Sequence, residues 1–182
     1  MVKLIIFDLD GVLVEAKKIH YDTLNLALEK IDKKYIIEWD DHLSTFDGLK
    51  TNQKLMMLTQ QRGLPINNHK EIWDDKQNLT LKALSELEPN KKLIKTMFNL
   101  VNDGYKIVCC SNSIRKTVLT VLSKLGIIEF FDYILSNEDV KNSKPHPEMY
   151  WKAMSFFGCI PSDVVIFEDY DKGCINENLI EN

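Results

Sequence analysis

Four short apolar runs, each followed at once by polar residues, constrain the fold of this chain more than any other feature of its sequence. The runs cover residues 2–7, 105–110, 133–135 and 164–167. A short continuous apolar run that stops at polar residues is typical of a buried strand in a parallel sheet. Helical patterns at residues 91–101 and 113–124 lie between successive runs. The alternation predicts an α/β, Rossmann-like core with a parallel sheet and right-handed crossovers.

The stretch that follows the first run differs from the rest of the chain. From residue 16 to residue 87 it shows helical periodicity but no convincing strand run. We therefore predict a small all-helical cap domain at 16–87, inserted into an α/β core domain made of residues 1–15 and 88–182. An insertion at this point is expected to overhang the carboxyl ends of the strands, where ligands bind in open α/β folds.

Polar side chains gather at the ends of the predicted strands. They are Asp8 and Asp10, Ser111 and Asn112, residues 136–139, and Glu168 and Asp169, with Lys144 between the third and fourth runs. An Asp-x-Asp pair alone is most often a turn or a helix cap. Together, however, these residues supply a nucleophilic carboxylate, a proton donor two residues away, oxygen ligands for a hard divalent cation, and a cation with a hydroxyl group for phosphate. The set predicts Mg²⁺-dependent phosphoryl transfer.

Composition narrows the choice of partners. The chain has 182 residues, 45% of them hydrophobic, and a formal net charge of −4. These values are ordinary for a globular protein and argue against a nucleic-acid partner. No apolar run approaches the roughly 20 residues of a membrane span, and no signal peptide is visible. We expect a cytoplasmic monomer or homodimer that does not bind membranes and acts on a small-molecule phosphate ester.

The polar motifs resemble those of a known family. Asp8-Leu-Asp10-Gly-Val-Leu-Val resembles the first motif of the haloacid dehalogenase superfamily, and Ser111-Asn112-Ser113 resembles the second. Lys144-Pro-His-Pro is similar to the third motif, and Phe167-Glu168-Asp169-x-x-x-Gly173 to the fourth. The nearest resemblance within the superfamily is to the β-phosphoglucomutase-like branch, whose members carry a helical cap after the first strand.

This resemblance implies a role for each matching position. Asp8 is the expected nucleophile, which becomes an aspartyl phosphate, and Asp10 is the expected general acid and base. Mg²⁺ is expected to be bound by Asp8, the backbone carbonyl of Asp10, Asp169 and Glu168. Ser111, the backbone near Asn112, and Lys144 are expected to hold the phosphate.

The resemblance also points to substrate residues in the cap. They are His20, Gly48, Lys50 and Lys76. A packed or surface histidine is the plainer interpretation of His20, and a solvated helix face is the plainer interpretation of Lys50 and Lys76.

The function implied is a Mg²⁺-dependent phosphatase that hydrolyses a small phosphomonoester, such as a sugar phosphate, through an aspartyl-phosphate intermediate. One alternative is a sugar phosphomutase, although the loop at 46–51 lacks an arginine that could clamp a second phosphate. Another is a catalytically weak binding protein, because residues 174–182 leave no room for the last strand of the family core, and Tyr170 stands where the family usually has serine.

Overall fold

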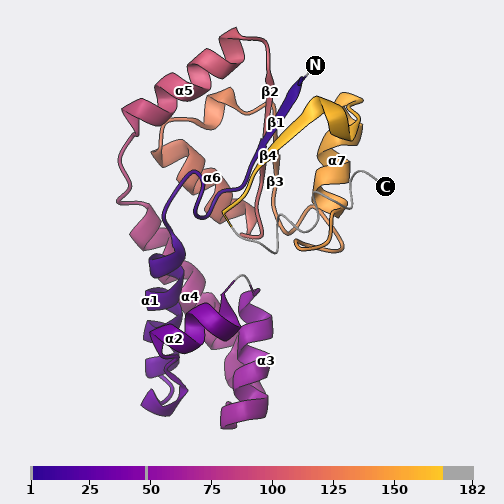
Figure 1. The fold of residues 1–182 in the computed structure, drawn as a ribbon. Helices are drawn as coiled ribbons and strands as arrows, with labels where there is room; N and C mark the ends of the chain where they lie inside the picture. The colour runs from indigo at the N-terminus through magenta and orange to yellow at the C-terminus, as the bar shows by residue number, and fades with distance from the viewer. Residues whose placement is uncertain (1, 48, 170–182) are drawn as a thin grey trace. The chain divides into compact units, whose positions relative to one another are not determined.

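The structure, a computed structural model, describes residues 2–47 and 49–169 of the chain. In these ranges one parallel sheet is formed by β1 (Leu4–Phe7), β2 (Lys106–Cys110), β3 (Tyr133–Leu135) and β4 (Val164–Phe167). Its strand order is β3-β2-β1-β4, and the strands run side by side in Figure 1. The four predicted apolar runs therefore form the sheet, and the α/β prediction is confirmed.

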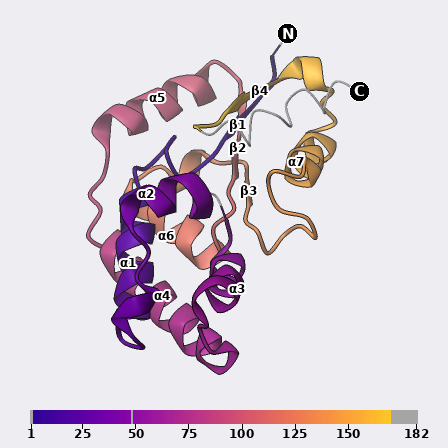
Figure 2. The same ribbon diagram turned by 60° about the horizontal axis from the view of Figure 1, so that its bottom comes forward.

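The sheet is covered on two faces. Helices α5 (Lys91–Asn102) and α6 (Arg115–Lys124) lie on one side of it, and α7 (Glu148–Phe157) lies on the other (Figures 1 and 2). The face toward α7 is apolar because Leu4, Ile6 and Val108 pack against Met149 and other buried residues of that helix. Two short 3-10 helices, Ile128–Phe130 and Pro161–Asp163, lead into β3 and β4.

The register of the sheet brings three strand ends to the same level. Phe7 pairs with Cys109 of β2 and with Phe167 of β4. The chain stays paired for one residue more, because the amide of Asp8 donates to the carbonyl of Phe167 at 2.9 Å. The residues that follow β1, β2 and β4 therefore leave the sheet side by side.

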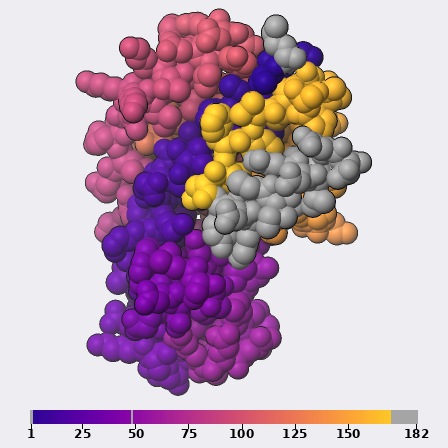
Figure 3. All heavy atoms as spheres, in the orientation of Figure 1, coloured from indigo at the N-terminus to yellow at the C-terminus, as the bar shows by residue number. Residues whose placement is uncertain are grey.

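Strand β4 lies at the edge of the sheet as far as the described residues go. Every residue of β1 is buried, whereas Val165 and Phe167 of β4 are 37% and 46% exposed. The yellow segment that includes β4 lies at the molecular surface in Figure 3. The predicted absence of a further strand concerns residues 174–182, which lie outside the described residues.

The chain divides into two compact units. One consists of Met1–Ala16 with Leu84–Asn182, and the other is Lys17–Ala83. The second unit contains the helices α1 (Lys17–Glu29), α2 (Trp39–Asp41) and α3 (Thr51–Arg62), and all but the last residue of α4 (His69–Leu84). It also contains a π-helical turn at His42–Phe46 and the 3-10 turns Lys33–Tyr35 and Ile66–Asn68. We call Lys17–Ala83 the helical unit and the other the sheet unit.

The helical unit has an apolar core of its own. Leu24, Leu28, Phe46, Leu55 and Leu58 are each at most 2% exposed and belong to one cluster. They come from α1, the π-helical turn and α3, whose apolar faces repeat at helical spacing. No helix in the described ranges combines the length and the apolar character that a membrane span requires.

Candidate active site

Lys144 joins the ends of three strands in the sheet unit. Its ammonium donates to Asp8 Oδ1 at 2.6 Å, to Glu168 Oε1 at 2.7 Å and to the carbonyl of Cys110 at 3.0 Å. These acceptors belong to, or directly follow, β1, β4 and β2. The side chains of Lys144 and Glu168 are only 8% and 3% exposed. The charges are therefore held in a place with little water, where electrostatic interactions are strong.

Burial and neighbouring charges set the protonation of this group. Burial raises the pKa of Asp8 to about 7, Lys144 lowers it, and the carboxylates of Glu168 and Asp10 raise it. Burial alone lowers the pKa of Lys144, but Asp8 and Glu168 outweigh it and hold that pKa above its ordinary range. Lys144 therefore remains an ammonium and provides a fixed positive charge beside Asp8.

Three carboxylates converge at the same strand ends. Ligand atoms of Asp8, Glu168 and Asp169 lie within 4.8 Å of one another. With Lys144 as the only cation within this group, the four residues carry a net negative charge when ionised. Carboxylate oxygens are the ligands that Mg²⁺ prefers in proteins, so the donor set fits a hard divalent cation.

Gly11 provides the space that Asp169 occupies. Its φ is +90°, and a Cβ atom at this position would lie 1.8 Å from Asp169 Oδ2. Such a distance is far below any non-bonded contact, so only glycine allows both the backbone conformation and the carboxylate. The first motif thus shapes the position of a predicted metal ligand that lies more than 150 residues away in the sequence.

The loop after β2 places hydroxyl and amide groups near the carboxylates. Ser113 Oγ donates to Asp10 Oδ2 at 3.1 Å, and the buried Ser111 Oγ accepts from the amide of Ser113 at 3.0 Å. Asn112 Nδ2 donates to the carbonyl of Lys144 at 2.9 Å. The predicted residues Ser111, Asn112 and Lys144 are therefore linked, and Asp10 is joined to them through Ser113.

Tyr150 is a member of the site that the sequence did not reveal. Its hydroxyl donates to Glu168 Oε1, and the residue is 1% exposed. Burial and the charge of Glu168 raise the pKa of Tyr150 above its ordinary range, so the hydroxyl keeps its proton and acts as a donor. The sequence gives one sign of this role: a tyrosine, whose hydroxyl is polar, stands among the apolar residues on the buried face of the helix that follows Lys144.

The predicted substrate residues of the cap all lie in the helical unit. Lys76 Nζ and His20 Nδ1 are 3.3 Å apart, and Lys76 is 8% exposed. Lys50 is exposed, and its backbone amide donates to Gln53 Oε1 at 3.0 Å at the start of α3. Gly48 lies outside the described residues. The structure therefore brings His20 and Lys76 together and gives Lys50 no such contact among the described residues.

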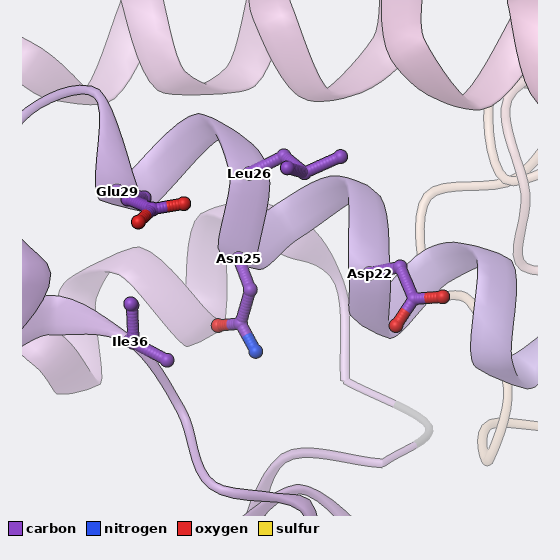
Figure 4. A pocket seen from close by; sticks show the side chains of 5 residues that line it. All are labelled: Asp22, Asn25, Leu26, Glu29 and Ile36. Carbon is purple, nitrogen blue, oxygen red and sulfur yellow. The ribbon is translucent and has the colours of Figure 1, made fainter.

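The helical unit also contains a hollow of about 350 Å³ that none of the predicted residues lines. It is bordered by Asp22, Asn25, Leu26, Glu29 and Ile36 (Figure 4). The amide of Asn25 is committed to the fold, because it donates to the Ile37 carbonyl and accepts from the Ile37 amide, both at 2.8 Å. The hollow is therefore a surface depression beside Asn25, whose side chain holds the Ile37 backbone through two hydrogen bonds.

Known proteins resemble this chain over most of its length. A phosphorylated carbohydrates phosphatase of Thermotoga maritima is 23% identical over 181 residues, which cover 93% of this chain and 77% of that protein. The pyrophosphatase PpaX of Bacillus cereus is 25% identical over 175 residues, covering 91% of this chain and 73% of that one. The crystal structure of β-phosphoglucomutase from Clostridium difficile matches with a TM-score of 0.83 at 23% identity and covers 100% of this chain and 82% of that chain.

The fold is therefore that of the β-phosphoglucomutase structure, sheet and helical insertion included. The family model described as haloacid dehalogenase-like hydrolase matches residues 5–176, which include all four predicted motifs. The expected membership in an enzyme family is confirmed by this match. The chain belongs to the haloacid dehalogenase-like hydrolases.

Proposed function

We propose that this protein is a phosphatase that hydrolyses a small phosphomonoester with Asp8 as the nucleophile. The observation that carries the proposal is the buried contact of Lys144 with Asp8 and Glu168 at the strand ends, next to Asp169. A phosphate dianion that approaches Asp8 meets like charges, and at a few ångströms this repulsion amounts to several kcal/mol at an effective dielectric of about 20. Lys144 offsets part of it by neutralising charge beside the nucleophile.

A divalent cation supplies the remaining charge compensation when it is bound. Asp8, Glu168 and Asp169 would hold it, and Mg²⁺ is the ion that we propose because of the all-oxygen donor set. The part played by the chain is to keep these carboxylates close together, with Gly11 leaving room for Asp169. In the proposed reaction Asp8 Oδ2 attacks phosphorus, while Oδ1 accepts from Lys144.

Proton transfer is assigned to Asp10. Its Oδ2 accepts a hydrogen bond from Ser113, which fixes the carboxyl group two residues from the nucleophile. In the proposed reaction Asp10 protonates the leaving oxygen as Asp8 forms the aspartyl phosphate. It then removes a proton from the water that releases phosphate, which is the usual reversal of roles for an acid–base residue. Ser111, whose hydroxyl accepts from the amide of Ser113, and Asn112 are proposed to contact the transferred phosphoryl group.

The relatives support phosphate release, since their names describe a phosphorylated carbohydrates phosphatase and a pyrophosphatase. We propose a small phosphate ester as the substrate, with His20 and Lys76 of the helical unit as contacts for its organic part. Lys76→Met is expected to raise KM more than it lowers kcat if this assignment is correct.

The test is phosphate release from a panel of phosphate esters by the purified protein, with and without Mg²⁺. We expect Mg²⁺-stimulated hydrolysis and a loss of at least 1,000-fold in kcat for Asp8→Asn, because the amide is not a nucleophile. Asp74→Asn changes a carboxylate in the same way on an exposed part of α4, where it pairs with Lys70, and is expected to leave turnover unchanged. Absence of Mg²⁺-stimulated release from every ester would contradict the proposal. Formation of a sugar 6-phosphate from the 1-phosphate would instead indicate a mutase.

A further inference from the structure

The turn that follows β3, at residues 136–139, contains polar residues to which the proposed reaction gives no role. The pairing of β2 with β3 continues into this region, because the amide of Ser111 donates to the carbonyl of Leu135 at 3.0 Å. The turn after β3 and the loop after β2 therefore lie next to each other in the sheet unit. We call residues 136–139 the β3 turn and residues 111–113 the β2 loop.

Asn137 holds two successive carbonyl groups of the β2 loop. Its side-chain amide donates to the carbonyl of Asn112 at 2.8 Å, and its backbone amide donates to the carbonyl of Ser113 at 3.2 Å. The C=O and N–H groups of one planar trans peptide unit point in opposite directions. Asn137 therefore fixes the orientation of two neighbouring peptide units in this loop.

The β3 turn is itself held in place, so it can support the loop. Asp139 Oδ2 accepts from the amide and the hydroxyl of Ser136, at 2.8 and 2.6 Å, and Ser136 is fully buried. Glu138 Oε2 accepts from the amide of Arg115 at 2.6 Å, and the guanidinium of Arg115 donates to Asp139. The turn thus contacts the β2 loop through Asn137 and the start of α6 through its two carboxylates.

The side chains of the β2 loop that lie on these peptide units reach the reacting groups. Ser113 Oγ donates to Asp10 Oδ2 at 3.1 Å. Asn112 Nδ2 donates at 2.9 Å to the carbonyl of Lys144, whose ammonium lies beside the proposed nucleophile. The peptide units that Asn137 holds therefore carry the contacts to the proposed proton-transfer residue and to the lysine of the site.

We propose that Asn137 is a positioning residue of the phosphatase reaction, which holds the β2 loop where Ser113 meets Asp10 and Asn112 meets the Lys144 backbone. The inference rests on the proposed phosphatase function. A displacement of about 1 Å near reacting groups can lower a rate about 100-fold. The hydrogen bonds of the partly buried Asn137, in contrast, can be replaced by water without loss of the fold. Removal of its amide should therefore harm turnover more than folding.

Asn137→Asp tests the proposal, because it keeps the size of the side chain and replaces the donating amide by a carboxylate, which cannot donate when ionised. With p-nitrophenyl phosphate and Mg²⁺ we expect kcat to fall by about 10- to 100-fold and KM to stay within about three-fold of the wild-type value. Asn99→Asp makes the same change on an exposed part of α5 and should alter neither constant.

A second variant covers the case in which Asn137→Asp is unfolded, as judged by circular dichroism. Asn137→Ala removes the donor without adding a charge, and the same change in kcat and KM is expected for it. A folded variant with kcat within about two-fold of the wild-type value, or with a KM that rises as much as kcat falls, overturns the proposal. Unfolding of both variants would assign Asn137 to the fold and overturn it as well.

A double variant shows whether Asn137 acts through the β2 loop. Ser113→Ala removes the hydroxyl that contacts Asp10. If Asn137 positions this hydroxyl, the loss of kcat in Asn137→Asp/Ser113→Ala should be smaller than the product of the two single losses by at least about three-fold. A loss equal to the product would mean that Asn137 does not act through Ser113, which contradicts the proposal.

Anion binding separates this inference from the phosphatase proposal. Orthovanadate adopts the five-coordinate geometry of a phosphoryl group in transfer, whereas inorganic phosphate stays tetrahedral. Both anions are titrated by calorimetry, in Mg²⁺, into the wild-type and Asn137→Asp proteins. A loss of at least about ten-fold in vanadate affinity with less than about three-fold in phosphate affinity supports the positioning role, even if no ester is hydrolysed and the phosphatase proposal fails. Equal losses for both anions, no loss for either, or a wild-type protein that binds neither anion contradicts the positioning role, whatever the esters show.

Discussion

Gly11 and Gly63 show how the same backbone conformation can serve different purposes in one chain. Both have positive φ, +90° for Gly11 and +70° for Gly63, but a Cβ atom would meet Asp169 at Gly11 and nothing within 4 Å at Gly63. Comparing an alanine variant at each position therefore distinguishes the effect of backbone strain from that of a clash with the predicted metal ligand.

We expect Gly11→Ala to weaken Mg²⁺ binding at least ten-fold, because Asp169 must move away from the added methyl group. Gly63→Ala is expected to cost about 1 kcal/mol in the free energy of unfolding and to leave Mg²⁺ affinity unchanged. The measurement is the Mg²⁺ dependence of turnover, together with urea unfolding of both variants. Equal Mg²⁺ affinity in the two variants would show that the space beside Gly11 is not needed for the cation.

The burial of Lys54, which is 8% exposed in the helical unit, leads to a prediction about stability. Burial lowers the pKa of Lys54 to about 8 in the folded protein, against 10.5 for an ordinary lysine. Between these two pH values the unfolded chain binds more protons, so stability rises with pH, and the full cost is present below pH 8. A shift of this size corresponds to a cost on the order of 3 kcal/mol.

Lys54→Met should therefore raise the free energy of unfolding at pH 7 by about 1–3 kcal/mol. The gain should shrink as the pH approaches 10.5, the value for an unperturbed lysine. Urea unfolding at pH 7 and near pH 10 measures both quantities. A destabilised Lys54→Met protein would contradict the expected cost of burying this ammonium.

Helix α7 connects the packing of the sheet to the site. Its apolar face buries Met149, Ala153 and Met154 against the strands, and the same face directs the Tyr150 hydroxyl to Glu168. Glu168 thus accepts from both Lys144 and Tyr150. The position of this carboxylate depends on a helix as well as on β4.

Tyr150→Phe is expected to weaken Mg²⁺ activation by about 5- to 30-fold, because one hydrogen bond that orients a charged ligand is lost. Tyr133→Phe removes a hydroxyl from a ring that stacks on Phe156 in the same unit, and it serves as the control. Turnover is measured against Mg²⁺ concentration for both variants. An unchanged Mg²⁺ dependence in Tyr150→Phe would restrict Tyr150 to packing.

The strands could be predicted from the sequence more fully than the contacts of the site. Residues 133–135 and 164–167 form the strands that their apolar runs predicted. The physical reason is clearest in β1, where every residue is buried, because a parallel strand covered on both faces needs apolar side chains on both. The partners of Asp10 and Glu168 could not be predicted in this way. Ser113 lies in a loop and Tyr150 in a helix. The sequence patterns of a loop and of a helix do not tell which distant carboxylate a side chain will contact.

The burial of Lys54 could not be predicted from the sequence either, for a physical reason. A lysine in a helical pattern is usually solvated, so the pattern gives no sign of burial. Burial of Lys54, which is 8% exposed, appears only once the helical unit is folded. Asp47 was visible only as part of the loop at 46–51, and its ion pair with Lys17 spans 30 residues of sequence.

At the scale of the whole molecule, the carboxylates of the site are expected to make the stability of the folded protein depend on cations. Asp8, Glu168 and Asp169 repel one another in the folded protein, and Lys144 compensates only part of their charge. A cation that binds the folded state alone stabilises it by mass action, by about 2.7 kcal/mol at 100 times its dissociation constant.

Mg²⁺ is therefore expected to raise the midpoint of thermal unfolding in a concentration-dependent way. Asp169→Asn should reduce this increase, whereas Asp74→Asn on the exposed face of α4 should not. Thermal unfolding followed by circular dichroism over a Mg²⁺ series measures the effect without any substrate. A midpoint that does not respond to Mg²⁺ in the wild-type protein would contradict the assignment of the three carboxylates as its ligands.

The pairing of Phe7 with both Cys109 and Phe167 has a consequence for how this chain can vary in length. Because successive side chains of a strand point to opposite faces, inserting or deleting a single residue in β1 would turn Asp8 away from Lys144, and the same change in β4 would turn Glu168 away. Parts of the connections that hold none of the site residues, such as the stretch between α6 and β3, are under no such constraint, since they can lengthen or shorten without shifting the strand ends. Tolerated insertions and deletions should therefore fall in such stretches and not in the four-residue strands β1 and β4.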